Sequence, residues 1–330
     1  MKKIFALLLS AALLVTLLAA CGGGTTTDTD TDAQEPAADA STTQVEEQEP
    51  DTGDASKDDP LNQDEIGEKE LLVVSFGTSY NDSRRETIGA IEKAMQTAFP
   101  DYSVRRAFTS QIIIDHVKDR DGVTIDNVEQ ALERAVNNGV KTLVVQPTHL
   151  MNGLEYEELT DELAKYSDSF EKIAIGDPLL TSDADFEAVM TAITDATKDA
   201  ADGKTAICFM GHGTTADSNS VYSKMQTLLT DKGFNDYYVG TVEATPSLDD
   251  VLAAVQKGNY EKVILRPLMI VAGDHANNDM AGDEDDSWKS TFEKAGYTVD
   301  CQVEGLGQLE AIQQLFVEHA KAAVASAEAE

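Results

Sequence analysis

The chain has 330 residues, and its 60 acidic and 25 basic side chains give it a formal net charge of −35. This charge excludes a protein that holds nucleic acid through phosphate contacts, and equally a surface that adheres to anionic lipid by its own charge. The length predicts about two domains, and an apolar fraction of 42% is sufficient for packed cores. Three cysteines exclude a disulfide scaffold and a cysteine-rich zinc module.

Residues 1–21 have the features of a lipoprotein signal peptide. Lys2 and Lys3 precede an apolar run from Ile4 to Ala20, and the ending Leu-Ala-Ala-Cys resembles the bacterial lipobox. We therefore expect Cys21 to carry the lipid, and the protein to be exported and anchored to the outer face of the bacterial cell membrane, or to be periplasmic. The alternative is an ordinary signal peptide in which the cysteine is coincidental.

Residues 22–70 contain 16 acidic residues and 2 lysines, a net charge of −14. Such a segment buries too little apolar area to offset its chain entropy, so we predict a disordered acidic stalk. A metal-collecting acidic tail is the alternative. Two cysteines follow the stalk, Cys208 and Cys301, and the sequence leaves open whether they pair.

The remaining chain alternates between strand and helix patterns, which predicts α/β domains with parallel sheets. Short apolar runs predict strands at residues 71–76, 104–108, 142–145, 172–175, 206–210, 238–242, 263–268 and 298–303. Helical spacing predicts helices near residues 83–98, 124–138, 184–199, 220–232, 248–257, 287–295 and 308–325. We assign residues 71–200 to an N-terminal α/β half and residues 201–330 to a C-terminal half. Whether the last helix packs on the N-terminal half stays open.

The two halves resemble each other. Phe76-Gly77-Thr78 matches His212-Gly213-Thr214 after the first strand of each half, and Gln146-Pro147 matches Arg266-Pro267 at the third. Continuing the second register sets Glu155 against His275. We predict two similar doubly wound domains related by a pseudo-twofold duplication, with a cleft between the carboxyl ends of their sheets.

Three consecutive strands of the second half are followed by metal-ligand side chains. His212, Glu243 and His275 come after them, and parallel strands bring their carboxyl ends to one edge. Two imidazoles and one carboxylate suit cobalt, nickel, iron(II) or zinc, and three ligands leave positions open for exchange. The alternatives are unrelated loop residues, or His212 as a general base without metal. Of the other histidines, we expect His116 and His319 to be structural, and His149 to be either structural or functional.

Several segments together resemble the anaerobic-type sirohydrochlorin cobaltochelatase family. They are residues 72–80 (LVVSFGTSY), 106–110 (RAFTS), 152–157 (NGLEYE), 209–213 (FMGHG) and 267–281 (PLMIVAGDHANNDMA). The resemblance runs from about Leu71 to the last helix. It implies a type II chelatase, a lyase that inserts metal into a tetrapyrrole without a nucleotide, as in cobalamin biosynthesis.

The resemblance also implies roles for residues. His212, Glu243 and His275 would hold the metal, and His212, His275 and Glu155 would be catalytic, with His212 favoured as the base that takes the pyrrole protons. Substrate contacts are expected at Ser75, Gly77, Thr78, Arg106, Gly213 and Arg266. Because sirohydrochlorin carries eight carboxylates, we expect local positive charge from Arg84, Arg85, Arg105, Arg106, Arg266 and Lys289.

An export signal on such a chain puts the physiological tetrapyrrole in question, because cobalamin intermediates are made in the cytoplasm. One hypothesis is an exported chelatase for cobalt, with iron or nickel as alternatives. The other is a surface lipoprotein that binds metal or a haem-like tetrapyrrole for uptake without catalysis, in concert with a transporter partner. A homo-oligomer is also open, and no nucleic-acid partner is expected.

Overall fold

A computed structural model describes residues 52–329. The signal peptide, Cys21 and residues 22–51 of the expected stalk lie outside the described residues. Among the helices that are described, none combines the length and the apolar character needed to cross a membrane.

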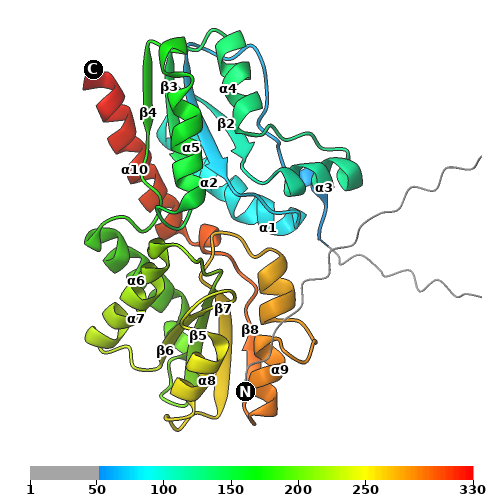
Figure 1. Ribbon diagram of the computed structural model, residues 1–330, viewed down its shortest axis with the longest axis vertical. Helices are drawn as coiled ribbons and strands as arrows, with labels where there is room; N and C mark the ends of the chain where they lie inside the picture. The colour runs from blue at the N-terminus through cyan, green and yellow to red at the C-terminus, as the bar shows by residue number, and fades with distance from the viewer. Residues whose placement is uncertain (1–51, 330) are drawn as a thin grey trace, which may run out of the picture. The chain divides into compact units, whose positions relative to one another are not determined.

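Eight strands form two four-stranded parallel sheets, one in each half (Figure 1). The strands are β1 (Lys69–Ser75), β2 (Ser103–Phe108), β3 (Thr142–Pro147), β4 (Lys172–Ile175), β5 (Thr205–Gly211), β6 (Tyr237–Thr241), β7 (Lys262–Pro267) and β8 (Thr298–Cys301). Their order is β2-β1-β3-β4 in the first sheet and β6-β5-β7-β8 in the second. The predicted α/β class with two similar parallel-sheet domains is confirmed.

Helices cover both sheets. They are α1 (Asn81–Glu86), α2 (Ile88–Ala98), α3 (Gln111–Asp121), α4 (Val128–Asn137), α5 (Leu154–Ala164), α6 (Asp183–Thr197), α7 (Ser220–Asp231), α8 (Leu248–Val255), α9 (Trp288–Lys294) and α10 (Glu310–Ala329). The predicted run 83–98 is divided between α1 and α2 at Thr87. Helix α5 and a π-helical turn at Ala276–Met280 were not predicted.

The internal repeat extends to the backbone pairing of the two sheets. Val74 of β1 pairs with Pro147 of β3, and Met210 of β5 pairs with Pro267 of β7. Gly77 and Gly213, which follow β1 and β5, both adopt left-handed backbone conformations, with φ of 102° and 89°. The two alignments made in the sequence, of residues 76–78 with 212–214 and of residues 146–147 with 266–267, therefore match equivalent positions of equivalent strands.

One helix packs differently from the predicted division at residue 200, and the packing of the last helix, which the sequence left open, is on the first half. Helix α6, which the sequence assigned to the N-terminal half, packs against α7, and Thr197 near its end hydrogen-bonds Tyr237 of β6 at 2.9 Å. Helix α10 returns to the first half and packs on β3, β4 and α2. The physical reason is that each helix buries an apolar face, with Phe186 in α6 and Phe316 in α10 belonging to the same core. The boundary after β4 is thus a better description than residue 200.

Residues 52–68, predicted as part of the stalk, are instead packed on the first half. The Asp58 side chain is only 4% exposed and accepts hydrogen bonds from Arg84 (2.6 Å) and Arg106 (2.7 and 3.0 Å). Leu61 is buried, and its carbonyl accepts the backbone N–H of Arg106 at 3.1 Å. Two buried guanidinium groups and one apolar side chain hold a segment whose composition alone indicated disorder.

Cys208 and Cys301 are free thiols. Cys208 lies beside Leu265 in the sheet, and Leu265 lies beside Cys301, so β7 separates the two cysteines. Two strand spacings amount to about 9–10 Å, which is beyond the Cα separation that a disulfide spans.

Candidate metal centre

His212, Glu243 and His275 converge at the carboxyl ends of β5, β6 and β7. One potential ligand atom from each lies within 4.8 Å of the others. His212 Nε2 is 4.0 Å from Glu243 Oε1, and the two imidazole centroids are 4.7 Å apart. The turn that carries Glu243 is fixed to β5, because the backbone N–H of Glu243 donates to the His212 carbonyl at 2.9 Å. The predicted convergence of these three side chains is therefore present.

Each imidazole is oriented through its Nδ1 atom. His212 Nδ1 lies 2.8 Å from the Gly213 carbonyl, and His275 Nδ1 lies 2.7 Å from Asp279 Oδ2. Since both partners are acceptors, both Nδ1 atoms carry the proton, and the Nε2 lone pairs are available to a metal. Asp279 reaches His275 from four residues on, in the π-helical turn, a type of turn frequent at functional sites.

The site is open to solvent. The side chains of His212 and Glu243 are 50% and 57% exposed, and that of His275 is 32% exposed. The residue after His212 is a glycine because the chain at Ala244 packs directly against it: a Cβ on Gly213 would lie 2.9 Å from Ala244. A ligand set that is accessible and limited to nitrogen and oxygen can bind a divalent cation and also release it.

Glu155 approaches this site from the first half. It lies in the first turn of α5, and burial raises the pKa of its carboxyl group while the nearby His212 charge acts in the opposite direction. A side chain at Gly153, two residues earlier, would come within 3.3 Å of Ser218 Oγ in the second half. Glu155 therefore belongs to a turn that contacts the second half and is near enough to His212 to feel its charge.

The expected substrate residues of the first half line its facing edge. Ser75 is buried and its Oγ lies 2.7 Å from Thr148 Oγ1, so its hydroxyl is already engaged. Thr78 is buried against Gly273, where a Cβ would lie 3.1 Å from Thr78 Oγ1. Gly77, between them, packs under the Phe108 ring. These residues position the loop that meets the His275 loop.

The prediction that basic side chains would surround the site with positive charge is wrong for most of the residues named. Arg106 is fully buried between Glu92 and Asp58, at 2.7 Å from each, and these carboxylates raise its pKa against the effect of burial. Arg266 is 5% exposed and donates to Glu304 and Gln302 at 2.8 and 3.1 Å.

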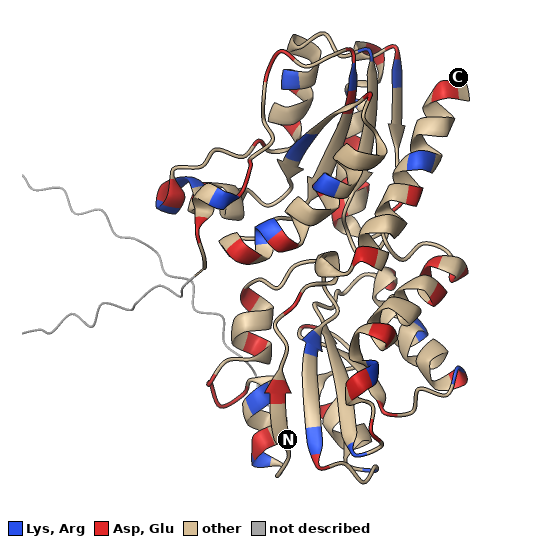
Figure 2. Cartoon of the chain, turned by 180° about the vertical axis from the view of Figure 1, so that it is seen from behind, with Lys and Arg blue, Asp and Glu red and all other residues tan. Residues whose placement is uncertain are grey.

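The other candidates also have acidic partners. Arg84 pairs with Asp58, Arg85 with Asp82 and Glu86, Arg105 with Glu70 and Asp126, and Lys289 with Asp283. Figure 2 shows basic and acidic residues interspersed over both halves rather than gathered into one basic face. Sequence position near strand ends could not distinguish a buried guanidinium from an exposed one.

Sequence reasoning missed three residues at these strand ends. Asp279 was missed as the partner of His275, although its spacing of four residues was a usable signal. Phe76 is 47% exposed and occupies the place in the first half that His212 occupies in the second. Leu154, next to Glu155, is 58% exposed. Exposed large apolar side chains are the usual mark of a binding surface when they gather.

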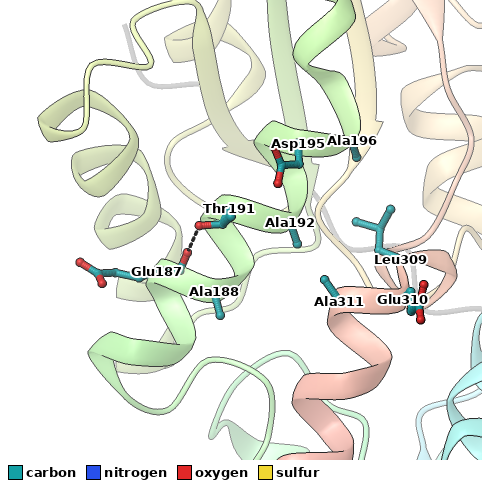
Figure 3. A pocket seen from close by; sticks show the side chains of 9 residues that line it. All are labelled: Glu187, Ala188, Thr191, Ala192, Asp195, Ala196, Leu309, Glu310 and Ala311. Atoms are coloured by element: carbon teal, nitrogen blue, oxygen red, sulfur yellow. Dashed lines mark hydrogen bonds between the residues drawn. The ribbon is translucent and has the colours of Figure 1, made fainter.

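A cavity of about 630 Å³ lies between α6 and α10, away from the histidines (Figure 3). Its lining consists of Glu187, Ala188, Thr191, Ala192, Asp195, Ala196, Leu309, Glu310 and Ala311. It contains none of the candidate catalytic residues, and its small side chains offer no metal-ligand set.

The fold and the site define a class, a duplicated α/β protein with an open set of potential metal ligands at the strand ends of one half. The family model described as cobalt chelatase (CbiK) matches residues 69–325. The chain belongs to this cobalt chelatase family, which confirms the resemblance found in its motifs.

Curated relatives support the same assignment. The sirohydrochlorin cobaltochelatase of Salmonella typhimurium is 38% identical over 251 residues, covering 76% of this chain and 94% of that protein. Sirohydrochlorin cobaltochelatase CbiKC of Nitratidesulfovibrio vulgaris is 30% identical over 260 residues, covering 78% and 91%. The solved structure of SirB from Bacillus subtilis with Fe³⁺ has a TM-score of 0.57 at 14% identity, covering 80% of this chain and 98% of that one, and so shares the fold.

Proposed function

We propose that this protein is a sirohydrochlorin cobaltochelatase, a lyase-type enzyme that inserts cobalt(II) into sirohydrochlorin for cobalamin biosynthesis. The observation that carries the proposal is the open set of His212, Glu243 and His275 in a chain of the cobalt chelatase family. The curated relatives that bear this activity in their names match over most of their length.

Cobalt is a substrate in this reaction, and the three side chains bind it before transfer. Nitrogen and oxygen ligands bind cobalt(II) without the retention that a thiolate site would impose. The two Nε2 atoms and the Glu243 carboxylate supply three ligands, so further positions stay open to the ring nitrogens of the macrocycle.

Insertion releases two pyrrole protons, and the base must not be occupied by the metal. An imidazole whose Nε2 binds cobalt has no lone pair left to accept a proton. Glu155 belongs to the opposite half, and partial burial raises the pKa of its carboxyl group, the direction that favours a base. We therefore assign proton removal to Glu155, which is half exposed and would accept the two protons one after the other and release each to solvent, in place of the His212 role expected from the sequence.

The macrocycle would lie between the two sets of strand ends. Phe76 and Leu154 present apolar surface on the first-half side, and the ring faces of a tetrapyrrole are apolar. Because the chain from residue 71 onward carries a net charge of −23, the peripheral carboxylates of the substrate are best accommodated in solvent.

We also propose that the protein is an exported lipoprotein. The support is the sequence of residues 1–21, with Cys21 as the lipidated residue and residues 22–51 as the spacer to the folded part. Nickel and iron are further metals that the same ligand types would accept.

The test is metal insertion into sirohydrochlorin, followed by the absorbance of the macrocycle. His212→Ala and His275→Ala should each abolish cobalt insertion, whereas His116→Ala, a change on α3, serves as the matched control and should retain it. Absence of turnover with cobalt in the wild type, together with tight haem binding, would instead favour the non-catalytic carrier.

A further inference from the structure

His149 is a buried histidine whose ring nitrogens have no partner. It follows β3 by two residues and is 7% exposed, and neither Nδ1 nor Nε2 has a hydrogen-bond partner or contact with solvent. Burial lowers its pKa to about 4, so the imidazole is neutral at pH 7 and carries one N–H. A buried donor without a partner destabilises the folded state, and such groups in native proteins call for an explanation.

The nearest ionisable partner of this ring is Glu155. His149 Nε2 lies 3.8 Å from Glu155 Oε2, a few tenths of an ångström beyond hydrogen-bond distance. The His149 backbone is fixed, because its carbonyl accepts the Leu179 N–H at 2.9 Å. The Glu155 side chain is 49% exposed, so it is the partner with freedom to move.

The internal repeat shows why a donor is needed here. In the pairing that equates Pro147 with Pro267, Glu155 corresponds to His275 and His149 to Met269. His275 is oriented by Asp279, which belongs to its own turn. The Glu155 side chain makes no hydrogen bond within residues 52–329, and His149 is the buried group that can supply one.

We propose that His149 is a positioning residue for Glu155: its Nε2–H donates to one carboxylate oxygen and directs the other toward the pyrrole N–H of the substrate. This inference rests on the proposed function. In the step itself, the pyrrole N–H bond breaks and an O–H bond forms on Glu155, with the electron pair left on the ring nitrogen that binds cobalt. His149 neither gains nor loses a proton.

Two substitutions separate positioning from folding. His149→Leu removes the donor, and His149→Gln retains an N–H near the place of Nε2. We expect His149→Leu to lower kcat about tenfold, with the KM for sirohydrochlorin and the cobalt affinity unchanged, and His149→Gln to recover most of the loss. In a Glu155→Gln background, His149→Leu should have no further effect on kcat.

A second measurement does not depend on turnover. Long-range ¹H–¹⁵N spectra of the whole protein should show a neutral His149 protonated at Nε2, with an Nε2 resonance that shifts in Glu155→Gln. Wild-type kcat in His149→Leu, equal losses in the Leu and Gln variants, or an Nε2 resonance insensitive to Glu155→Gln would each overturn the proposal. If the wild type inserts no metal, the proposed function fails, while the spectra still decide whether His149 and Glu155 interact.

Discussion

The hydrogen bond between His275 and Asp279 should set a measurable part of the cobalt affinity. Its length of 2.7 Å is typical of a charge-assisted bond, and because it engages Nδ1 it leaves Nε2 as the ring nitrogen available to a metal. Loss of an outer carboxylate behind a metal-binding histidine costs about 10–100-fold in affinity, which corresponds to about 1.4–2.7 kcal/mol. Because Asp279 is 44% exposed and solvent screens it, we expect the lower end for Asp279→Ala, about tenfold.

The assay is direct titration of the purified protein with cobalt(II), followed by calorimetry or by the visible bands of the bound ion. Asp279→Asn keeps an oxygen acceptor without the charge, so its affinity should fall between those of the wild type and Asp279→Ala. Asp283→Asn is the matched control, since that carboxylate lies four residues further on and bonds Lys289 rather than a histidine. Unchanged affinity in Asp279→Ala, or an equal loss in Asp283→Asn, would refute the assigned role.

Three further predictions concern Asp58 in the segment 52–68, the exposed Phe76, and Cys21. Asp58→Ala should destabilise the protein by about 3–5 kcal/mol in denaturant unfolding, because it leaves the buried Arg84 without a carboxylate partner and leaves Arg106 with Glu92 alone. Burial opposes ionisation of Asp58, but Arg106 and Arg84 outweigh it. Their hydrogen bonds and their positive charges lower the pKa of the Asp58 carboxyl group. The stability that the Asp58 carboxylate contributes is therefore present above the pKa of an unfolded aspartate and is lost as pH falls through its lower pKa in the folded protein. If Asp58→Asn left the loss of stability at acidic pH unchanged, this prediction would be contradicted. Phe76→Ala should raise the KM for sirohydrochlorin severalfold without changing cobalt affinity, and Phe76→Leu should raise it less; equal values in all three proteins would exclude contact with the macrocycle. Cys21→Ser should abolish incorporation of labelled palmitate by the bacterium, and labelling of the variant equal to wild type would disprove lipidation at that residue.

Much of the sheet architecture could be predicted from local sequence. Strands such as Leu71–Ser75 are buried on both faces, so they form uninterrupted apolar runs that chain order alone converts into parallel sheets. The convergence of His212, Glu243 and His275 followed from the same property, because parallel strands bring their carboxyl ends to one edge wherever the helices lie. His212 and His275 were therefore predictable without knowledge of any long-range packing.

Features that depend on long-range partners were not predictable in the same way. The helical pattern of α6 shows an apolar face but not which sheet buries it, and the structure places that helix beside α7. The sequence around Asp58 has the composition of a disordered acidic segment. Its ion pairs with Arg84 and Arg106, which are distant in sequence, attach it to the folded part. The same ion pairs remove Arg106 from the substrate site, so both errors have a single physical origin.

The repeat has kept its backbone and diverged in its chemistry, which suits a reaction with two opposed charge movements. Equivalent positions carry Phe76 and His212 after the first strands, and Glu155 and His275 after the third. A metal cation must enter the macrocycle as two protons leave it, and positive charges that share one face repel each other. We infer that placing the metal ligands on the second half and the base on the first lets the cation approach one ring face while protons depart from the other.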